Sequence, residues 1–344
     1  MQRPLLVLLA LAPAAAALTI SDPGQGIFNY TAANAPGLSG ITYIGGNTFH
    51  AVNDSAAPPR VFPLTIGIES NGTISSASIG TPTALAAGHD HEDVAFHPGR
   101  GTIFVSDEGD HPDGGYIREF AFPSGTLAGT VALPPVLLRD RQNLGLEALS
   151  FGAGFLWTAN EEALEHESAP ATASGGSTVR LQRFDAAFGI AGQWAYETDP
   201  ASSASGASGL LALPDGNLLV LERATGFTSP SSFRNRIYLV DFSGATDVSG
   251  IADLDDTPFA PVTKTLLWER NMGSTATHNF EGITLGPQLG EESFSIILIA
   301  DNGTGSQQHL YPLLIHGIPE PGTVAGVASA LTLLFARRVR RRSH

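Results

Sequence analysis

The chain has 344 residues, of which 42% are hydrophobic, contains no cysteine and carries a formal net charge of −15 at pH 7. This acidic balance argues against a nucleic acid partner and favours a hard cation such as Ca²⁺. Disulfide bonds cannot hold the fold, which therefore needs a substantial buried core.

The first residues predict a secretory signal peptide at 1–17. Arg3 precedes an apolar run at 5–11, and the small residues at 14–17 match an A-x-A cleavage site. A buried N-terminal helix is the alternative interpretation. We expect export through the Sec pathway and a mature domain that covers residues 18–317.

Short strands recur through this domain, and helical periodicity is hard to find. Alternating β-branched and aromatic runs are bounded by Gly, Pro, Asn and Asp. Five times, a small or acidic residue precedes a short apolar strand, and a second strand then ends in a polar pair. A third strand candidate follows in most copies, at 116–122, 178–184, 236–242 and 309–315.

A repeat of roughly 40–70 residues with four antiparallel strands is typical of a propeller blade. The sequence therefore predicts an all-β fold, a β-propeller of five four-stranded blades. Residues 20–30 would supply the missing strand of the last blade and close the ring. The stretches 185–204 and 243–261 leave room for a sixth blade. A β-sandwich is the alternative, but it would not show the repeated polar signature.

The polar signature residues should meet in space. In antiparallel strands, the start of the first strand and the end of the second lie at the same edge. A radial arrangement then gathers them at one mouth of the central channel. The gathered residues are Glu92, Asp107, Glu108, Glu147, Asn160, Glu161, Glu222, Arg223, Glu281, Asp301 and Asn302.

Crowded carboxylates repel one another and need positive charge nearby to stay ionised. We expect Ca²⁺ and Arg223 to supply that charge. Taken singly, each Asp or Asn could be an ordinary turn residue that faces solvent. Glu92, Glu147 and Glu281 occupy the same position in their repeats, at the start of the first strand. Because glutamate is a poor turn former, this shared position favours a common metal or polar role. Two other copies have serines at that phase, Ser39 and Ser208.

Two other kinds of catalytic site are less well supported. The sequence contains no G-x-S-x-G motif, the nucleophile elbow that positions the catalytic serine in α/β-hydrolases. His89 and His91 flank Asp90 as an H-x-H motif that could bind a transition metal, although such a pair on a surface loop is usually no metal site.

The order of several motifs resembles the family described as esterase-like activity of phytase, a group of exported bacterial propellers. These motifs are Asp107-Glu108-Gly, the strand starts at Glu147 and Glu281, Leu-Val-Leu-Glu222-Arg223, and Ile-Ala-Asp301-Asn302-Gly. The resemblance extends from about residue 37 to residue 315. It implies hydrolysis of an ester or phosphate ester at an acidic, cation-dependent site on the propeller face.

Within that site we assign catalytic roles to Glu92, Glu147, Glu281 and Arg223. The candidate metal ligands are Glu92, Asp107, Glu108, Glu147, Glu161, Glu222, Glu281, Asp301 and Asn302. Basic residues are few near the signature, with Arg118, Arg180 and Arg223 the obvious ones, so densely charged phytate fits poorly as a substrate. A non-catalytic propeller that binds surface polysaccharide or a protein is the alternative function.

The C-terminal residues 318–344 have three parts in a fixed order. Pro319-Glu320-Pro321-Gly322 precedes an apolar stretch at 323–336, which is followed by five arginines between 337 and 342. This order resembles the PEP-CTERM sorting signal, which exosortase-type enzymes process in Gram-negative bacteria. It implies transient membrane insertion and a final place in the cell envelope, at the cell surface or in the extracellular matrix. A permanent anchor is the alternative, but this stretch of 14 residues falls below the usual span of about 17–25.

Overall fold

Four-stranded antiparallel sheets make up almost the whole computed structural model of the protein. The model describes residues 17–32, 34–54, 58–88, 90–108, 114–141, 144–167, 169–201, 205–225, 232–272, 279–303 and 305–319. One short 3-10 helix, η1 (Pro135–Leu138), is the only helix within these ranges. The predicted all-β fold is confirmed.

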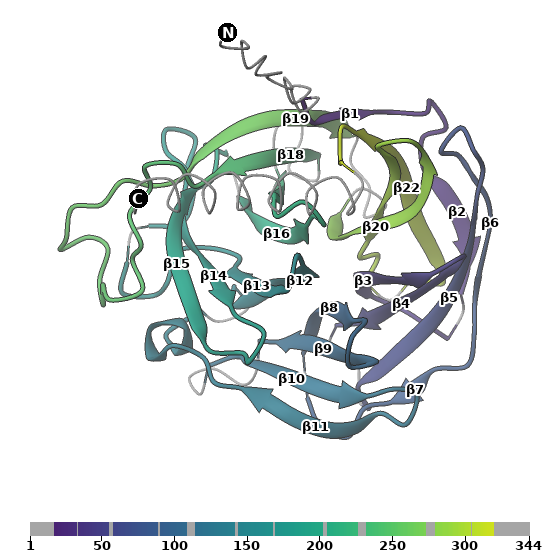
Figure 1. Ribbon diagram of the computed structural model, residues 1–344, viewed down its shortest axis with the longest axis horizontal. Coiled ribbons are helices and arrows are strands. Elements are labelled where there is room, and N and C mark those ends of the chain that lie inside the picture. Colours follow the sequence, from purple (N-terminus) through teal and green to yellow (C-terminus); the bar gives the residue numbers. More distant parts are fainter. Residues whose placement is uncertain are drawn as a thin grey trace, which may run out of the picture.

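Five blades surround a central channel, as Figure 1 shows. Blade 1 consists of β3 (Leu38–Gly45), β4 (Thr48–Asn53), β5 (Arg60–Ile68) and β6 (Ile74–Ile79), and the short β7 (Thr83–Ala84) pairs with β5. Blade 2 consists of β8 (His91–His97), β9 (Thr102–Asp107), β10 (Tyr116–Ala121) and β11 (Thr126–Val131). Blade 3 consists of β12 (Leu146–Gly152), β13 (Phe155–Asn160), β14 (Thr178–Phe184) and β15 (Ile190–Glu197).

Blade 4 consists of β16 (Ser205–Ala212), β17 (Leu218–Thr225), β18 (Phe233–Asp241) and β19 (Thr263–Met272). Blade 5 consists of β20 (Phe280–Gly290), β21 (Ser293–Ala300) and β22 (Gln307–His316), together with the N-terminal strands β1 (Thr19–Ser21) and β2 (Phe28–Thr31). The described strands form no sixth blade: the stretch 185–204 contains β15, and 243–261 connects β18 to β19.

The N-terminal strands close the ring, as the sequence predicts. Both β1 and β2 pair antiparallel with β22, and Thr19 lies opposite His316 while Tyr30 lies opposite Gln308. Beyond the sheet, Arg270 of blade 4 donates a hydrogen bond of 2.8 Å to Asp22. Blade 5 is thus built from both ends of the domain.

The hydrophobic core is divided among the five joints between blades. Each of the five large clusters of buried apolar side chains draws on two neighbouring blades, for example Phe104 and Ile117 of blade 2 with Leu149 and Leu156 of blade 3. Strand residues point alternately to the two faces of a sheet. Because both faces of a blade are buried, residues on both sides of its inner strands are apolar. This explains the near-continuous apolar runs in the first two strands of each repeat.

Residues 1–16 of the expected signal peptide and 320–344 of the expected sorting tail lie outside the described residues. Within the part of the chain that is described, no helix has the length and hydropathy needed to cross a bilayer.

Candidate active site

The first strand of every blade carries a β-bulge near its beginning. The pairing with the second strand shifts by one residue at this point in all five blades. A bulge adds an unpaired residue and re-aims its side chain. The bulges fall at the shared phase identified in the sequence, which is occupied by Ser39, Glu92, Glu147, Ser208 and Glu281.

The second strands supply a matching set of polar residues. Just before each bulge, the first strand pairs with Asn53, Asp107, Asn160, Glu222 or Ala300. The next residue along each second strand lies one step nearer the mouth and has its side chain on the opposite side. These next residues are Asp54, Glu108, Glu161, Arg223 and Asp301, and all five line one pocket.

The pocket lies at the mouth of the channel, has a volume of about 170 Å³ and is lined only by charged residues. Seven of its nine lining residues belong to the predicted set, and the convergence of Glu92, Glu147 and Glu281 agrees with the predicted geometry. The lining residues are Asp54, Asp90, Glu92, Glu108, Glu147, Glu161, Arg223, Glu281 and Asp301.

Sequence reasoning missed two of these acids, Asp54 and Asp90. Asp54 occupies the second place of the polar pair in blade 1, the same place as Glu108 and Glu161, and that register could have identified it. Asp90 stands two residues before Glu92 in an extended segment, so both side chains emerge on the same side.

Four residues expected at the mouth lie outside the pocket. For three of them, the pleat turns the first member of the pair away. Asp107 pairs with Arg118 and has an oxygen 3.7 Å from Nε2 of His91. Asn160 accepts a hydrogen bond of 3.0 Å from the backbone N–H of Arg180.

Glu222 is the third of these residues, and it is buried between blades 3 and 4. It accepts hydrogen bonds from the Tyr196 hydroxyl at 2.6 Å and from Lys264 at 2.5 Å. The fourth, Asn302, stands one residue beyond the pocket, because Ala300 and Asp301 hold the two paired positions in blade 5. Its side-chain oxygen accepts the N–H of Gly37 at 3.3 Å.

Arg223 is the one cation among the described residues that line the pocket. Its guanidinium binds Glu161 and Glu281, and it donates a 2.6 Å hydrogen bond to Asn279. Asn279 in turn donates a 2.9 Å hydrogen bond to Glu281. The pocket therefore has one compensated side, at blades 3 to 5.

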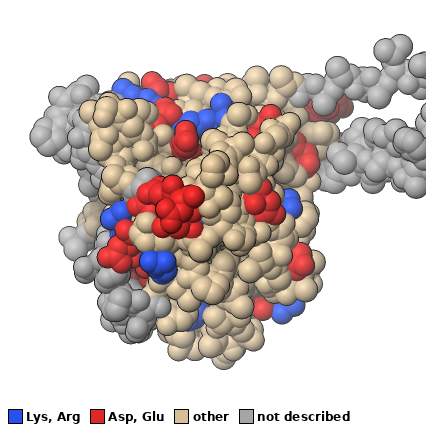
Figure 2. Space-filling view, turned by 90° about the vertical axis from the view of Figure 1, so that its left-hand side faces the viewer, with Lys and Arg blue, Asp and Glu red and all other residues tan. Residues whose placement is uncertain are grey.

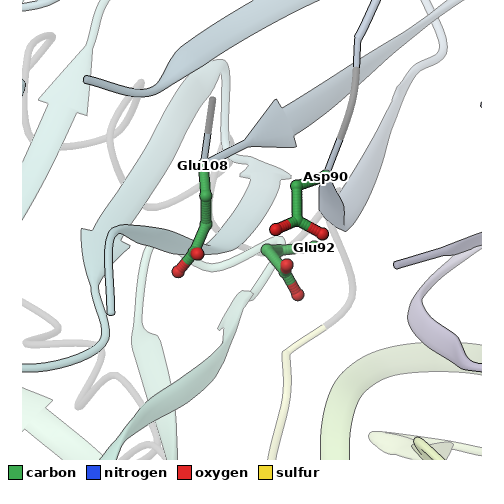
Figure 3. Close-up of side chains that lie close together, drawn as sticks. All are labelled: Asp90, Glu92 and Glu108. Carbon is green, nitrogen blue, oxygen red and sulfur yellow. The ribbon is translucent and has the colours of Figure 1, made fainter. Parts of the chain in front are cut away.

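On the other side, none of the described lining residues is a cation. Asp90, Glu92 and Glu108 each place a carboxylate oxygen within 4.8 Å of the others (Figure 3). From the described residues, the Glu92 carboxylate accepts one long hydrogen bond, of 3.4 Å from Ser39. Glu108 accepts the N–H of Gly145 at 2.7 Å.

Burial and mutual repulsion shift the acids toward their neutral forms. Burial, followed by the charges of Glu108 and Glu281, raises the pKa of Glu92 well above its ordinary value. Burial raises the pKa of Glu281 to about 8 even though Arg223 opposes the shift, and it raises the pKa of Glu108 to about 7. Without a cation, the pocket must therefore bind protons near neutral pH.

Glu147 is the least satisfied of the pocket acids. Its side chain is 6% exposed, lines the pocket and makes no hydrogen bond with the described residues. Burial and the charges of Glu92 and Glu161 raise its pKa well above the ordinary value, and Arg223 lowers it in part. A buried carboxylate without a donor needs a ligand, a water or a proton.

The donor set fits a hard divalent cation. Carboxylate oxygens are the ligands that Ca²⁺ prefers, and several of them can close around one ion. Asp90, Glu92 and Glu108 are the residues that would hold the ion.

The serines and histidines named in the sequence do not form a second catalytic group among the described residues. Ser208 donates to the backbone carbonyl of Phe280 at 3.1 Å, which ties blade 4 to blade 5. His91 is buried beside Asp107, and its expected partner His89 lies outside the described residues.

Acidic side chains also gather on the outer flank seen in Figure 2. The segment that connects β18 to β19 lies on this side of the ring and carries Asp247, Asp253, Asp255 and Asp256. Asp247, Asp255 and Asp256 are exposed, and none of the four lines the acidic pocket.

The fold and the site define a five-bladed propeller with a carboxylate-lined pocket at one channel mouth. The sequence matches the family described as "Esterase-like activity of phytase" over residues 34–304. The chain therefore belongs to this phytase-like family.

Solved structures resemble the chain weakly. A thermostable family-43 glycoside hydrolase is 10% identical, with a TM-score of 0.45 and coverage of 82% of this chain and 92% of that one. An exo-β-1,3-galactanase from Phanerochaete chrysosporium is 13% identical, with a TM-score of 0.44 and coverage of 84% and 64%. Kuenenia stuttgartiensis hydrazine synthase is 9% identical, with a TM-score of 0.38 and coverage of 79% and 58%.

The chain thus spans less than two thirds of the galactanase and hydrazine synthase chains. Similarities at this level support no conclusion about activity. No curated protein matches the sequence.

Proposed function

We propose that the protein hydrolyses an ester or a phosphate ester at the acidic pocket with the help of a divalent cation, most simply Ca²⁺. The observation that carries this proposal is the pocket itself, in which eight carboxylates face one arginine. Membership of the phytase-like family supports an ester substrate.

The cation would be held by Asp90, Glu92 and Glu108, whose carboxylate oxygens lie within 4.8 Å of one another. When bound there, it would supply positive charge that neutralises the oxygens of the substrate. The residues of the chain supply the remaining functions of the site.

Glu147 is the best candidate for the general base. Its carboxylate is free of hydrogen-bond donors among the described residues. A cation bound nearby would favour its ionised form, which can accept a proton from an attacking water. Arg223 holds Glu161 and Glu281 in place and keeps a positive charge on that side of the pocket. The small pocket volume favours a substrate that presents one ester or phosphate group rather than many.

The test is hydrolysis of p-nitrophenyl phosphate and p-nitrophenyl acetate, each with added Ca²⁺ and with a chelator. We expect turnover of at least one substrate with Ca²⁺ and a loss of about 10²–10⁴-fold in Glu147→Gln. Asp255→Asn, on the exposed flank, is the control and should keep full activity. No turnover of either substrate, together with an unchanged melting temperature on chelation, would leave the protein a non-catalytic binding module.

Export and C-terminal processing belong to the same proposal. Arg3 with its apolar run, and Pro319-Glu320-Pro321 with its apolar and arginine-rich sequel, support a secreted protein sorted to the cell envelope or extracellular matrix. Mass determination of the protein isolated from its native cells tests both cleavages.

A further inference from the structure

A second cavity, of about 480 Å³, lies at the end of the channel opposite the acidic pocket. It is lined by the later halves of the five first strands and by the turns that follow them. Its lining contains no charged residue, in contrast to the all-charged acidic pocket. The volume falls within the range of about 300–1,000 Å³ that small-molecule sites occupy.

Between the two ends, buried groups of neighbouring first strands lie in close contact, and the two cavities share no lining residue. Asp93, which follows Glu92 in the bulge of blade 2, is buried, and its carboxylate accepts the N–H groups of Val94 at 2.8 Å and Leu149 at 2.9 Å. At the same level, a Cβ on Gly40 would lie 2.3 Å from the Cα of Asp93. The two cavities are therefore separate sites.

Hydroxyl groups at repeated positions join the blades around the second cavity. Thr42 accepts the N–H of Phe96 at 3.0 Å, and Ser150 accepts the N–H of Ala212 at 2.9 Å. Thr284 accepts the N–H of Tyr43 at 3.0 Å and donates its own hydrogen to a backbone carbonyl.

Thr42 and Ser150 each retain one unused donor. Both residues are 8% exposed and line the cavity, and neither hydroxyl hydrogen has an acceptor among the described residues. A buried donor without an acceptor is costly, and a ligand oxygen would satisfy it. With no basic residue in the lining, a neutral oxygen fits this site better than a carboxylate.

We propose that this cavity binds a neutral, mainly apolar small molecule whose carbonyl or ether oxygen accepts hydrogen bonds from Thr42 and Ser150. The surrounding apolar side chains, among them Ile44, Phe151 and Leu285, bury the rest of the ligand. This site does not depend on the chemistry proposed for the acidic pocket.

The probe for this site is Prodan, a neutral naphthalene with one ketone oxygen, whose fluorescence shifts to the blue in apolar surroundings. We expect saturable binding to the full chain. N,N-dimethyl-2-naphthylamine, which lacks the ketone, should bind about 3–10-fold more weakly, because it cannot accept the two hydrogen bonds.

Two variants locate the probe. Leu285→Lys places a charge on the lining and should weaken Prodan binding at least about tenfold, whereas Leu266→Lys, at a 47% exposed leucine outside the cavity, should leave it unchanged. Ser150→Ala should reduce the difference in affinity between Prodan and the ketone-free compound.

Ser150→Ala also removes the acceptor of an inter-blade hydrogen bond, so circular dichroism is used to verify that this variant folds. Leu285→Lys leaves that hydrogen bond intact and provides a second test. Absence of saturable binding, or equal binding by Leu285→Lys and Leu266→Lys, would overturn the proposal. Equal affinity for Prodan and the ketone-free compound would overturn the role of the hydroxyl donors.

Discussion

At the scale of single residues, the pocket acids are held close together against their repulsion. Glu147 lies near Glu92, Glu161 and Glu281, each of which raises its pKa. It has no hydrogen-bond donor among the described residues to offset that repulsion. Such an arrangement stores unfavourable free energy that a bound cation would release.

Glu147→Gln should therefore stabilise the metal-free protein while weakening the response to Ca²⁺. Removing one of the crowded charges should raise the free energy of unfolding by about 1–2 kcal/mol, or the melting temperature by about 2–4 °C. Thermal unfolding of both proteins, with a chelator and with Ca²⁺, measures this. A lower melting temperature for the variant in chelator would contradict this prediction, because it would mean that the Glu147 carboxyl group stabilises the metal-free protein.

Arg223→Leu should have the opposite effect. It removes the cation that pairs with Glu161 and Glu281 and leaves two buried acids unpaired, at a cost of about 3–5 kcal/mol. Urea unfolding in chelator measures the loss, which added Ca²⁺ should partly restore. Arg139→Leu, at an exposed arginine, is the matched control and should change the free energy of unfolding by less than about 0.5 kcal/mol.

His50 gives a pH dependence away from the acidic pocket. It is buried against Phe122, with ring centroids 4.2 Å apart, and burial lowers its pKa from 6.5 to about 4. The unfolded chain then binds the proton more tightly than the folded protein does, so the stability contributed by neutral His50 is complete above pH 6.5 and falls as the pH approaches 4.

By that reasoning, the protein should lose about 3 kcal/mol through this group between pH 7 and pH 4. His50→Gln, which cannot titrate, should show a shallower fall in urea midpoint across this range. Parallel pH profiles for the two proteins would mean that His50 does not titrate on unfolding in the expected way.

At the scale of elements, the repeated bulge builds the site. In every blade, one extra residue in the first strand turns a side chain into the mouth, and the end of the second strand supplies another. Three blades place a glutamate on the bulge and two place a serine, so the ring is not five-fold symmetric. Among the described lining residues, the positive charge therefore comes from blade 4, through Arg223, and blade 2 contributes acids.

Closure of the ring depends on β1 and β2. Deletion of residues 17–31 should leave β22 with an unpaired edge and remove Asp22, the partner of Arg270. We expect a loss of several kcal/mol and a broader unfolding transition, because blade 5 would no longer be held by both ends of the domain. Chemical unfolding followed by circular dichroism tests this; an unchanged midpoint would show that blade 5 does not need its N-terminal strands.

At the scale of the whole molecule, both ends of the domain lie on the face opposite the acidic pocket. The chain leaves β22 at His316, which is paired with Thr19, the first residue of β1. On the inner side, β22 pairs with β21 so that His316 lies beside Ser293, far from the strand end at Ala300 that borders the pocket. A chain tethered by its C-terminal segment would therefore present the acidic pocket away from the membrane.

Single cysteines can test this orientation, because the natural chain has none. Ser306→Cys lies between β21 and β22 on the pocket face, and Glu291→Cys lies between β20 and β21 on the opposite face. Both sites are exposed. On cells that hold the unprocessed chain, an impermeant maleimide should label the first faster than the second. Faster labelling of Glu291→Cys would contradict this orientation.

Much of the fold could be predicted from the sequence, because strand patterning and the polar signature repeat along the chain. Five blades, closure by residues near 20–30, and the common phase of Glu92, Glu147 and Glu281 follow from that repetition alone. The count of blades stayed open, because the long connections at 185–204 and 243–261 have no signature that excludes another blade.

The site was predicted less completely, because strand pairing decides which member of each polar pair enters the pocket. Asp107 and Glu222 look equivalent to Glu108 and Arg223 in the sequence. The pleat turns both away from the pocket, so that Asp107 contacts Arg118 and Glu222 contacts Lys264. In blade 5 the pair is displaced by one residue, so Asp301 enters the pocket and Asn302 does not.

The sequence by itself determined the propeller and the presence of crowded acids at one mouth, because both depend on residue types that recur at a fixed spacing. Only the tertiary structure decided which acids meet, that Asp54 and Asp90 join them, and that Arg223 neutralises one side alone. The physical reason is that a bulge or a one-residue shift in register moves a side chain to the other face of a strand, and neither leaves a mark in a single sequence.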